Sequence, residues 1–265
     1  MVRVITAIIL GFAAVVGIWW LPAWAFDWLV FLAVVGSLLE LSRMFFADLC
    51  ERWATVVIGS LVAFLMIFYF REDVVMLPLL VFAVFALCCF FMWRTQQMEG
   101  VANRLGISVM ALLYLGVSLS LWSWLRHQIL GREFIMFAVV PSCLCDTFAY
   151  LTGKLIGRHR LAPVVSPNKT IEGFFGALIG SLLGSFVVWY LLIHFIPWWH
   201  ILILASCIWF ISPLGDLIES MMKRSVGVKD SGKVIPGHGG LLDRLDALTF
   251  AGPFVYVYVK YVLQV

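Results

Sequence analysis

Long apolar runs alternate with short clusters of charged residues along the whole chain. Cutting the chain at these clusters leaves segments near the ~20 residues that a helix needs to cross a bilayer. Strict alternation of polar and apolar positions is missing, which excludes the strands of a transmembrane barrel. The pattern predicts an all-α, polytopic membrane bundle of about nine spans, at residues 4–24, 27–46, 53–70, 74–93, 104–125, 133–153, 171–196, 199–220 and 245–264.

Composition strengthens the prediction of a membrane protein. Of the 265 residues, 63% are hydrophobic and 12% are charged, against roughly 45–50% and about 25% in soluble domains. A soluble protein of this size cannot bury so much apolar surface. A cytosolic enzyme, a disordered chain and a secreted disulfide scaffold are therefore excluded. The six cysteines include no C-x-x-C pair and mostly lie within apolar runs, so we expect them to be structural.

The distribution of positive charge predicts the orientation of the helices. With the N-terminus in the cytoplasm, fourteen of the 18 Lys and Arg residues lie on the cytoplasmic side and four on the other. This asymmetry favours an N-in, C-out topology with an odd number of spans. Residues 23–25 have the small-x-small pattern of a signal cleavage site. The apolar stretch before them exceeds the ~7–15 residues of a signal peptide, so we expect the first span to be retained.

The two halves of the chain differ in their loops. Residues 1–130 have short, weakly charged loops and are expected to form a supporting domain with a possible role in dimerisation. Residues 131–265 contain two long polar loops, 154–170 and 221–244, both on the predicted cytoplasmic side. Polar groups concentrated within a membrane protein mark its functional site. We therefore expect residues 131–265 to form the catalytic domain.

The last polar segment contains acidic residues at helical spacing. Asp216, Ser220 and Lys223 share one helix face, and Asp243 and Asp246 share another at the start of the last predicted span. Carboxylate oxygens are the ligands that Mg²⁺ prefers, and the ion commonly bridges them to substrate phosphates. The two acid pairs therefore predict a divalent-metal site at the membrane edge.

The same segment is rich in glycine and in basic residues. Gly239 and Gly240 allow backbone N–H groups to converge on an anion, and nearby Lys and Arg side chains can neutralise phosphate charge. Acids, bases and a glycine-rich turn together are what phosphoryl or nucleotidyl transfer requires. The alternative is a positive-inside loop held together by Asp–Arg pairs. His238 is either a base or substrate contact, or a residue that hydrogen-bonds backbone.

Two further polar sites precede this segment. Asp146 lies within a predicted span, roughly 12 Å from its end at 1.5 Å per residue, where a carboxylate needs a polar cavity or a cation. The alternative is pairing with an arginine of the bundle. Ser166 or Asn168 can cap the next span, whose N-terminus favours an anion. Capping does not explain Lys169 and Glu172 together at the membrane surface.

These motifs resemble the phosphatidate cytidylyltransferase (CDP-diglyceride synthase) family. Its signature runs S-x-x-K-R, four residues, K-D, and then H-G-G-x-x-D-R-x-D. It is matched without a gap by Ser220, Lys223, Arg224, Lys229, Asp230, His238, Gly239, Gly240, Asp243, Arg244 and Asp246. Two other family motifs are matched by Asp146, Tyr150, Gly153 and Lys154, and by Ser166, Pro167, Lys169, Thr170, Glu172 and Gly173. The resemblance covers about residues 140–265, and the first half adds only compatible hydropathy.

The resemblance implies a multi-pass enzyme of the bacterial inner membrane, often a homodimer, with its active site facing the cytoplasm. It would make CDP-diacylglycerol and pyrophosphate from CTP and phosphatidic acid, with Mg²⁺ and a possible K⁺, and would bind membrane lipids but no nucleic acid. The family places its metals at Asp216 and Asp243, and we add Asp146 and Asp246 as candidate ligands. The expected catalytic residues are Lys223, Arg224, Lys229, Asp230, His238, Arg244 and Asp246. The expected substrate-binding residues are Asp146, Lys154, Ser166, Lys169, Thr170, Glu172, Ser220, Gly239 and Gly240.

The chemistry of this reaction agrees with the residues present. A phosphate monoester has a second pKa of ~6, so the phosphatidate oxygen is already a nucleophile at neutral pH. No protein nucleophile is required. Other hypotheses are a CTP-dependent membrane lipid kinase and a CDP-alcohol phosphotransferase, whose D-G-x-x-A-R core the sequence lacks. An ion-coupled transporter is a third hypothesis. Inverted repeats in the sequence would support it, and none is evident.

Overall fold

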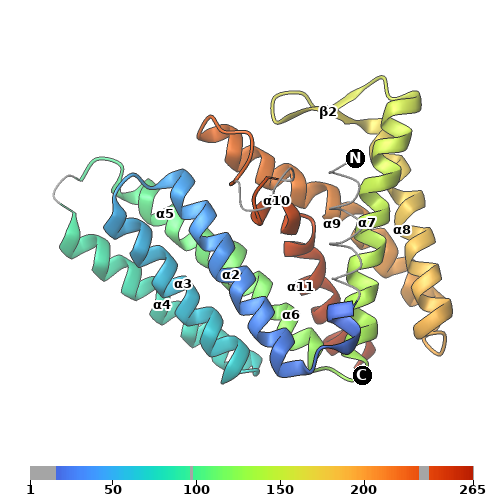
Figure 1. The fold of residues 1–265 in the computed structure, drawn as a ribbon, viewed down its shortest axis with the longest axis horizontal. Helices are drawn as coiled ribbons and strands as arrows, with labels where there is room; N and C mark the ends of the chain where they lie inside the picture. Colours follow the sequence, from blue (N-terminus) through green and yellow to red (C-terminus); the bar gives the residue numbers. More distant parts are fainter. Residues whose placement is uncertain (1–15, 96–97, 233–238, 265) are drawn as a thin grey trace.

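The computed structural model describes residues 16–95, 98–232 and 239–264, and these residues are almost entirely helical (Figure 1). Residues 16–20 are helical. The helices that follow are α2 (Ala23–Phe45), α3 (Leu49–Phe68), α4 (Asp73–Arg94), α5 (Val101–Ala111), η1 (Leu112–Val117), α6 (Ser118–Arg126), α7 (Gly131–Ile156), α8 (Ile171–Leu192), α9 (Trp198–Ser225), α10 (Leu242–Leu245), α11 (Leu248–Tyr258) and η2 (Val259–Leu263). The strands β1 (Arg160–Ala162) and β2 (Ser166–Thr170) form an antiparallel hairpin.

Seven helices among the described residues are long and apolar enough to cross a membrane, with α5, η1 and α6 forming one continuous span, Val101–Arg126. They coincide with seven of the nine predicted spans, so the prediction of an all-α membrane bundle is confirmed. The ninth predicted span contains a shorter apolar helix, Leu248–Leu263. Most of the first, 4–24, lies outside the described residues.

Two predicted loops are more ordered than their polarity suggested. The predicted span 199–220 continues as α9 to Ser225, because the side chain of Lys223 finds acidic partners inside the protein. The predicted loop 154–170 contains the end of α7 and the β1–β2 hairpin. Capping explains the next boundary, since Thr170 Oγ1 accepts a hydrogen bond from the N–H of Gly173 at the start of α8.

Helices α7 and α8 approach each other closely along a row of glycines. Gly176, Gly180 and Gly184 recur every fourth residue of α8, so they lie on one face. A Cβ atom at Gly180 would collide with the carbonyl of Leu144, and one at Gly184 would lie 2.8 Å from Cα of Pro141. Small residues at this spacing allow close packing of membrane helices. The contact fixes α7, and with it Asp146, relative to the loop that precedes α8.

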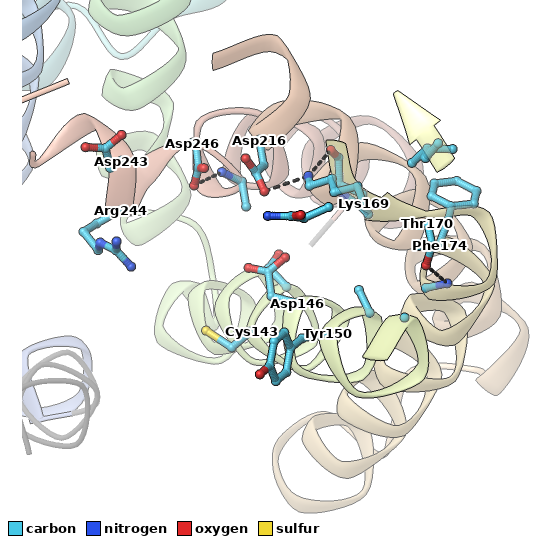
Figure 2. A pocket seen from close by; sticks show the side chains of 18 of the residues that line it. Cys143, Asp146, Tyr150, Lys169, Thr170, Phe174, Asp216, Asp243, Arg244 and Asp246 are labelled. Atoms are coloured by element: carbon cyan, nitrogen blue, oxygen red, sulfur yellow. Dashed lines mark hydrogen bonds and ion pairs between the residues drawn. The ribbon is translucent and has the colours of Figure 1, made fainter. Parts of the chain in front are cut away.

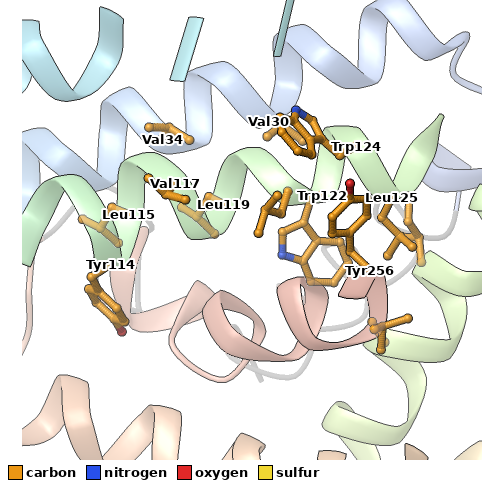
Figure 3. Packing of buried hydrophobic residues seen from close by; sticks show 14 of the residues in the cluster. Val30, Val34, Tyr114, Leu115, Val117, Leu119, Trp122, Trp124, Leu125 and Tyr256 are labelled. Carbon is orange, nitrogen blue, oxygen red and sulfur yellow. The ribbon is translucent and has the colours of Figure 1, made fainter. Parts of the chain in front are cut away.

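Tryptophans of α6 connect the first helices to the last one (Figure 3). The indole N–H of Trp124 donates to the carbonyl of Met66 at 2.7 Å, and its ring meets the edge of Tyr256 on α11 at 5.6 Å. Trp122 donates to the carbonyl of Leu248 at 3.2 Å. Helix α11 also packs on α7 and α9, so it lies at the seam between α2–α6 and α7–α9 (Figure 1).

Two ion pairs lie at the end of the bundle where α11 and η2 finish. Asp27, 2% exposed, accepts hydrogen bonds from Arg71 at 2.7 Å and from Ser123 at 2.6 Å. Asp73 at the start of α4 pairs with Lys260 of η2. Both acids join separate helices, and both have a cation as partner. This end is held together by matched charges.

Candidate active site

A cavity of about 810 Å³ opens at the other end of α11, between α7, β2, α9 and α10. Its floor and walls come from segments that the sequence singled out independently. Among the described residues, nine charged side chains line it: Asp146, Lys154, Lys169, Asp216, Lys223, Asp230, Asp243, Arg244 and Asp246. All nine were predicted site residues, so the structure brings the three motifs together in one cavity.

Three carboxylates from different elements face the same space (Figure 2). Asp146 lies on α7, opposite Asp216 of α9 and Asp246, which follows α10. Lys169 of β2 lies beside Asp216, with its Nζ 2.7 Å from Asp216 Oδ2 and 3.1 Å from the carbonyl oxygen of Pro213. The ammonium group thus occupies a position where the acids attract positive charge.

Close backbone packing holds Asp216 next to Asp246. A Cβ atom at Gly215 would lie 2.7 Å from the carbonyl oxygen of Asp246, so glycine allows α9 to approach this segment. Burial, and then the charge of Asp216, raise the pKa of Asp246 to about 6. Two carboxylates held side by side create a site that favours a cation.

Asp243 has a different environment from the other acids. Its Oδ1 accepts a hydrogen bond from Lys223 Nζ at 2.5 Å, and its Oδ2 accepts from the N–H of Gly240 at 2.8 Å and of Ser231 at 3.0 Å. Burial acts to raise its pKa, but these hydrogen bonds outweigh burial and hold the pKa below its usual range. Gly239, at φ +81°, supplies the left-handed turn that brings the Gly240 N–H to the carboxylate.

The predicted metal centre is not shown by these side chains alone. Within the described ranges, no three His, Cys, Asp or Glu side chains are grouped closely enough to hold a metal ion. Both oxygens of Asp243 already accept hydrogen bonds from protein groups, whereas Asp146, Asp216 and Asp246 face the cavity. The assignment of metal ligands therefore remains a prediction.

Several predicted substrate-binding residues shape the rim of the cavity. Thr170 lines it and also caps α8, and the Lys154 ammonium lies 5.8 Å from the ring centroid of Tyr150. The carboxylate of Glu172 instead accepts hydrogen bonds from the N–H of Arg158 at 3.0 Å and from His159 Nδ1 at 2.7 Å. It closes the base of the β1–β2 hairpin and is not among the residues that line the cavity. Ser166, at the start of β2, does not line it either.

The residues of the signature motif likewise fall into two groups, those that line the cavity and those that do not. Ser220 donates to Asp216 Oδ1 at 3.3 Å, so it acts on the cavity through that carboxylate. Arg224 donates to the carbonyl of Val228 at 3.1 Å, and Lys229 is exposed. Neither residue lines the cavity. His238 lies outside the described residues.

Glu219 was missing from the sequence-based site. Its side chain on α9 is fully buried, with Oε2 3.2 Å from Lys223 Nζ, and Lys223 in turn bridges to Asp243. The sequence signal was its i, i+4 spacing to Lys223, the geometry of a helical ion pair. It directly precedes Ser220, the first matched residue of the signature motif, and was not assigned a role.

Comparison with known proteins agrees with the motifs. The profile of the family described as "Cytidylyltransferase family" matches residues 1–262. The chain belongs to the cytidylyltransferase family. Its similarity therefore extends into the first half, beyond the motif region of about residues 140–265. Together with the seven long apolar helices, this makes the chain a multi-pass membrane protein.

Individual relatives support the family assignment. A protein of Staphylococcus saprophyticus named phosphatidate cytidylyltransferase is 42% identical over 149 residues, and one of Staphylococcus aureus (strain COL) with the same name is 41% identical over 149 residues. Each match covers 56% of this chain and 56% of the relative. The aligned chain thus spans just over half the length of the relatives it matches.

Proposed function

We propose that this chain transfers the cytidylyl group of CTP to phosphatidic acid, giving CDP-diacylglycerol and pyrophosphate. The observation that carries the proposal is the highly charged cavity at one end of an otherwise apolar bundle. A triphosphate and a lipid phosphate both need cationic partners, which Lys154, Lys169, Lys223 and Arg244 supply. The names of the relatives and the family assignment support this choice of substrates.

The reaction needs alignment and charge neutralisation more than protein nucleophiles. A phosphate oxygen of phosphatidate attacks the α-phosphorus of CTP, and the bond from that phosphorus to the β-phosphate oxygen breaks. Pyrophosphate leaves with the electron pair. Basic side chains on α7, β2, α9 and α10 surround the cavity, so they can hold both substrates at once and stabilise the leaving group.

The acidic residues fit a Mg²⁺ site, which this proposal includes. Asp146, Asp216 and Asp246 face one space from three elements, and the Lys169 ammonium already lies against Asp216. Carboxylate oxygens are the donors that Mg²⁺ prefers, and a bound ion would supply positive charge to the triphosphate. Asp243 would support the site by holding Lys223 and the glycine turn. A second cation such as K⁺ remains a prediction.

The proposal places the cavity on the cytoplasmic side of a bacterial inner membrane, with nine spans in an N-in, C-out arrangement. The asymmetry of Lys and Arg supports this orientation, and CTP would then enter from the cytosol while phosphatidate enters from the bilayer. A homodimer through residues 1–130 remains a prediction from the resemblance. Single cysteines near Arg158 and near His200 should label from opposite sides of the membrane, and labelling from one side would reject this topology.

Labelled CTP separates this reaction from the alternative lipid kinase. The protein is reconstituted in vesicles with phosphatidate and Mg²⁺, and CTP carries label on either the α- or the γ-phosphate. We expect α-label in the lipid and γ-label in pyrophosphate. Transfer of γ-label to a lipid would instead indicate the kinase. Exchange of labelled pyrophosphate into CTP without lipid would require a cytidylyl-enzyme intermediate and would reject direct attack.

A further inference from the structure

A buried carboxylate from the first half of the chain holds the segment that forms the wall of the cavity. Glu40, 4% exposed, lies near the end of α2, 201 residues before Leu241 in the chain. Its Oε1 accepts a hydrogen bond from the N–H of Leu241 at 2.9 Å, and its Oε2 accepts one from the N–H of Leu242 at 2.9 Å. Leu242 begins α10 and Leu241 is the residue just before it, so both N–H groups lie where a helix offers no backbone partner.

The same carboxylate is connected to Asp243 through a serine. Ser231 Oγ lies 2.9 Å from Glu40 Oε2 and 3.1 Å from Asp243 Oδ2. A hydroxyl donates one hydrogen at a time, and the Ser231 N–H is directed to Asp243 as well, at 3.0 Å. Glu40 and Asp243 therefore hold residues 231 and 240–242 from two sides, and Asp243 in turn binds Lys223.

Small residues leave room for this contact. A Cβ atom at Gly232 would lie 2.6 Å from Glu40 Oε1, and one at Gly240 would collide with Glu40 Oε2 and with Ser231 Oγ. One turn before Glu40, a Cβ atom at Gly36 would lie 2.7 Å from the Leu241 side chain. Gly36 and Glu40 share one face of α2. This face of α2 therefore contacts the turn that carries Asp243, and α10 also contacts α2.

We propose that Glu40 is a positioning residue for the proposed cytidylyl transfer: it fixes α10, and so sets where Asp243 and Arg244 meet the substrates. The inference rests on the proposed function for its effect on turnover but not for its effect on the loop. The contact between Glu40 and the turn also gives the first half of the chain a direct part in the site. A shift of about 1 Å in such a wall is enough to slow a reaction about a hundredfold.

The experiment compares two buried glutamates of the first half in the full chain, reconstituted in vesicles. E40Q keeps the size of the side chain but replaces one acceptor oxygen with a donor, which faces backbone N–H groups. E51Q is the matched control, because Glu51 is also buried and pairs with Arg104 at 2.9 Å, away from the turn. S231A removes the bridge to Asp243 and carries the test if E40Q does not fold.

We expect E40Q to lower kcat by about tenfold or more, and S231A by about threefold, while E51Q stays within about twofold of the unchanged protein. Amide hydrogen exchange should become about tenfold faster in residues 239–245 of E40Q, with α3 unchanged. If Glu40 only stabilised the fold, E40Q and E51Q would instead lower the melting temperature to a similar extent. Amide exchange in residues 239–245 would then change no more than exchange in the other residues.

Two results would overturn the inference: near-normal kcat in folded E40Q, or unchanged exchange in residues 239–245 of E40Q and S231A. Equal loss of activity in E51Q would also reject it, since the effect would then be general. If the unchanged protein makes no CDP-diacylglycerol, the proposed function fails, and hydrogen exchange still decides whether Glu40 holds the turn.

Discussion

Acidic side chains have different neighbours at the two ends of the segment formed by α11 and η2. At the end near η2, Asp27 pairs with Arg71 and Asp73 pairs with Lys260, so each carboxylate meets a cation from another part of the chain. At the cavity end, Asp216 has a second carboxylate beside it as well as its partner Lys169, and burial, followed by the charge of Asp216, raises the pKa of Asp246 to about 6. Matched charges hold helices together, whereas acids kept side by side reserve a place for a cation or ligand. We therefore expect Asp27 and Asp73 to stabilise the fold and the acids of the cavity to act in the reaction.

The largest expected effect comes from neutralising the carboxylates that face the cavity. Asp216→Asn and Asp246→Asn keep the shape of the side chain but remove negative charge from the cavity. We expect each to lower turnover by about 10²–10³-fold, as loss of one key electrostatic group does in other enzymes. Turnover is measured as CDP-diacylglycerol formed at saturating CTP and Mg²⁺. Asp246→Asn relieves the repulsion from Asp216 and should not lower the melting temperature, whereas Asp216→Asn also loses its ion pair with Lys169 and should change the melting temperature little. Normal turnover in either variant would reject the site.

The opposite result is expected for the matched acids. Asp27→Asn leaves the partly exposed Arg71 without its carboxylate, and losing a hydrogen bond to a charged group costs about 1–2 kcal/mol. Thermal unfolding followed by tryptophan fluorescence should show this loss as a lower melting temperature. Turnover per folded molecule should stay unchanged, because Asp27 lies at the far end of the bundle from the cavity. A turnover defect in a stably folded D27N protein would contradict the division of roles.

Acid should weaken the proposed Mg²⁺ site without weakening the fold there. The pKa of Asp246 is raised to about 6 by burial and by Asp216, so protons compete with the cation below that pH. The Mg²⁺ concentration that gives half-maximal turnover should rise about tenfold per pH unit below 6. Because the folded pKa exceeds the unfolded value of ~3.9, this group stabilises the fold as the pH falls from 6 toward 4. A requirement for Mg²⁺ that does not change between pH 7 and pH 5 would argue against Asp246 as a ligand.

Much of the bundle could be predicted because a bilayer restricts the backbone to a few solutions. A spanning segment must satisfy its own N–H and C=O groups, so long apolar runs become helices. The charged residues of the cavity were also predictable, because each is a costly exception within an apolar chain. The predicted end of the span at residue 220 is too early, because the sequence pattern places Lys223 in a loop. Its partners Glu219 and Asp243 lie within the protein, so the helix continues past it.

Contacts between distant segments could not be predicted in the same way. Glu40 lies near the end of an apolar run and reads as an ordinary charged helix end, because its partners are backbone amides of Leu241 and Leu242. Backbone amides leave no side-chain pattern in a sequence. The different environments of Asp243 and Asp216 were not predictable either, since the resemblance assigns both acids the same role as metal ligands and only their neighbours in the structure differ.

The smallest expected effect concerns Glu172, which the motif match placed among the substrate-binding residues. Its carboxylate holds the N–H groups of Arg158 and His159 at the base of the β1–β2 hairpin and does not line the cavity. Glu172→Gln keeps one acceptor oxygen, so we expect turnover to fall only about threefold, mainly through a higher KM for CTP as Lys169 on β2 becomes less well held. Lys169→Gln, which removes a cation from the cavity itself, is the comparison and should cost about tenfold more. Steady-state kinetics of the two variants tests this prediction. An equal loss of turnover in both would indicate that Glu172 contacts the substrate. The site would then extend to the β1–β2 hairpin.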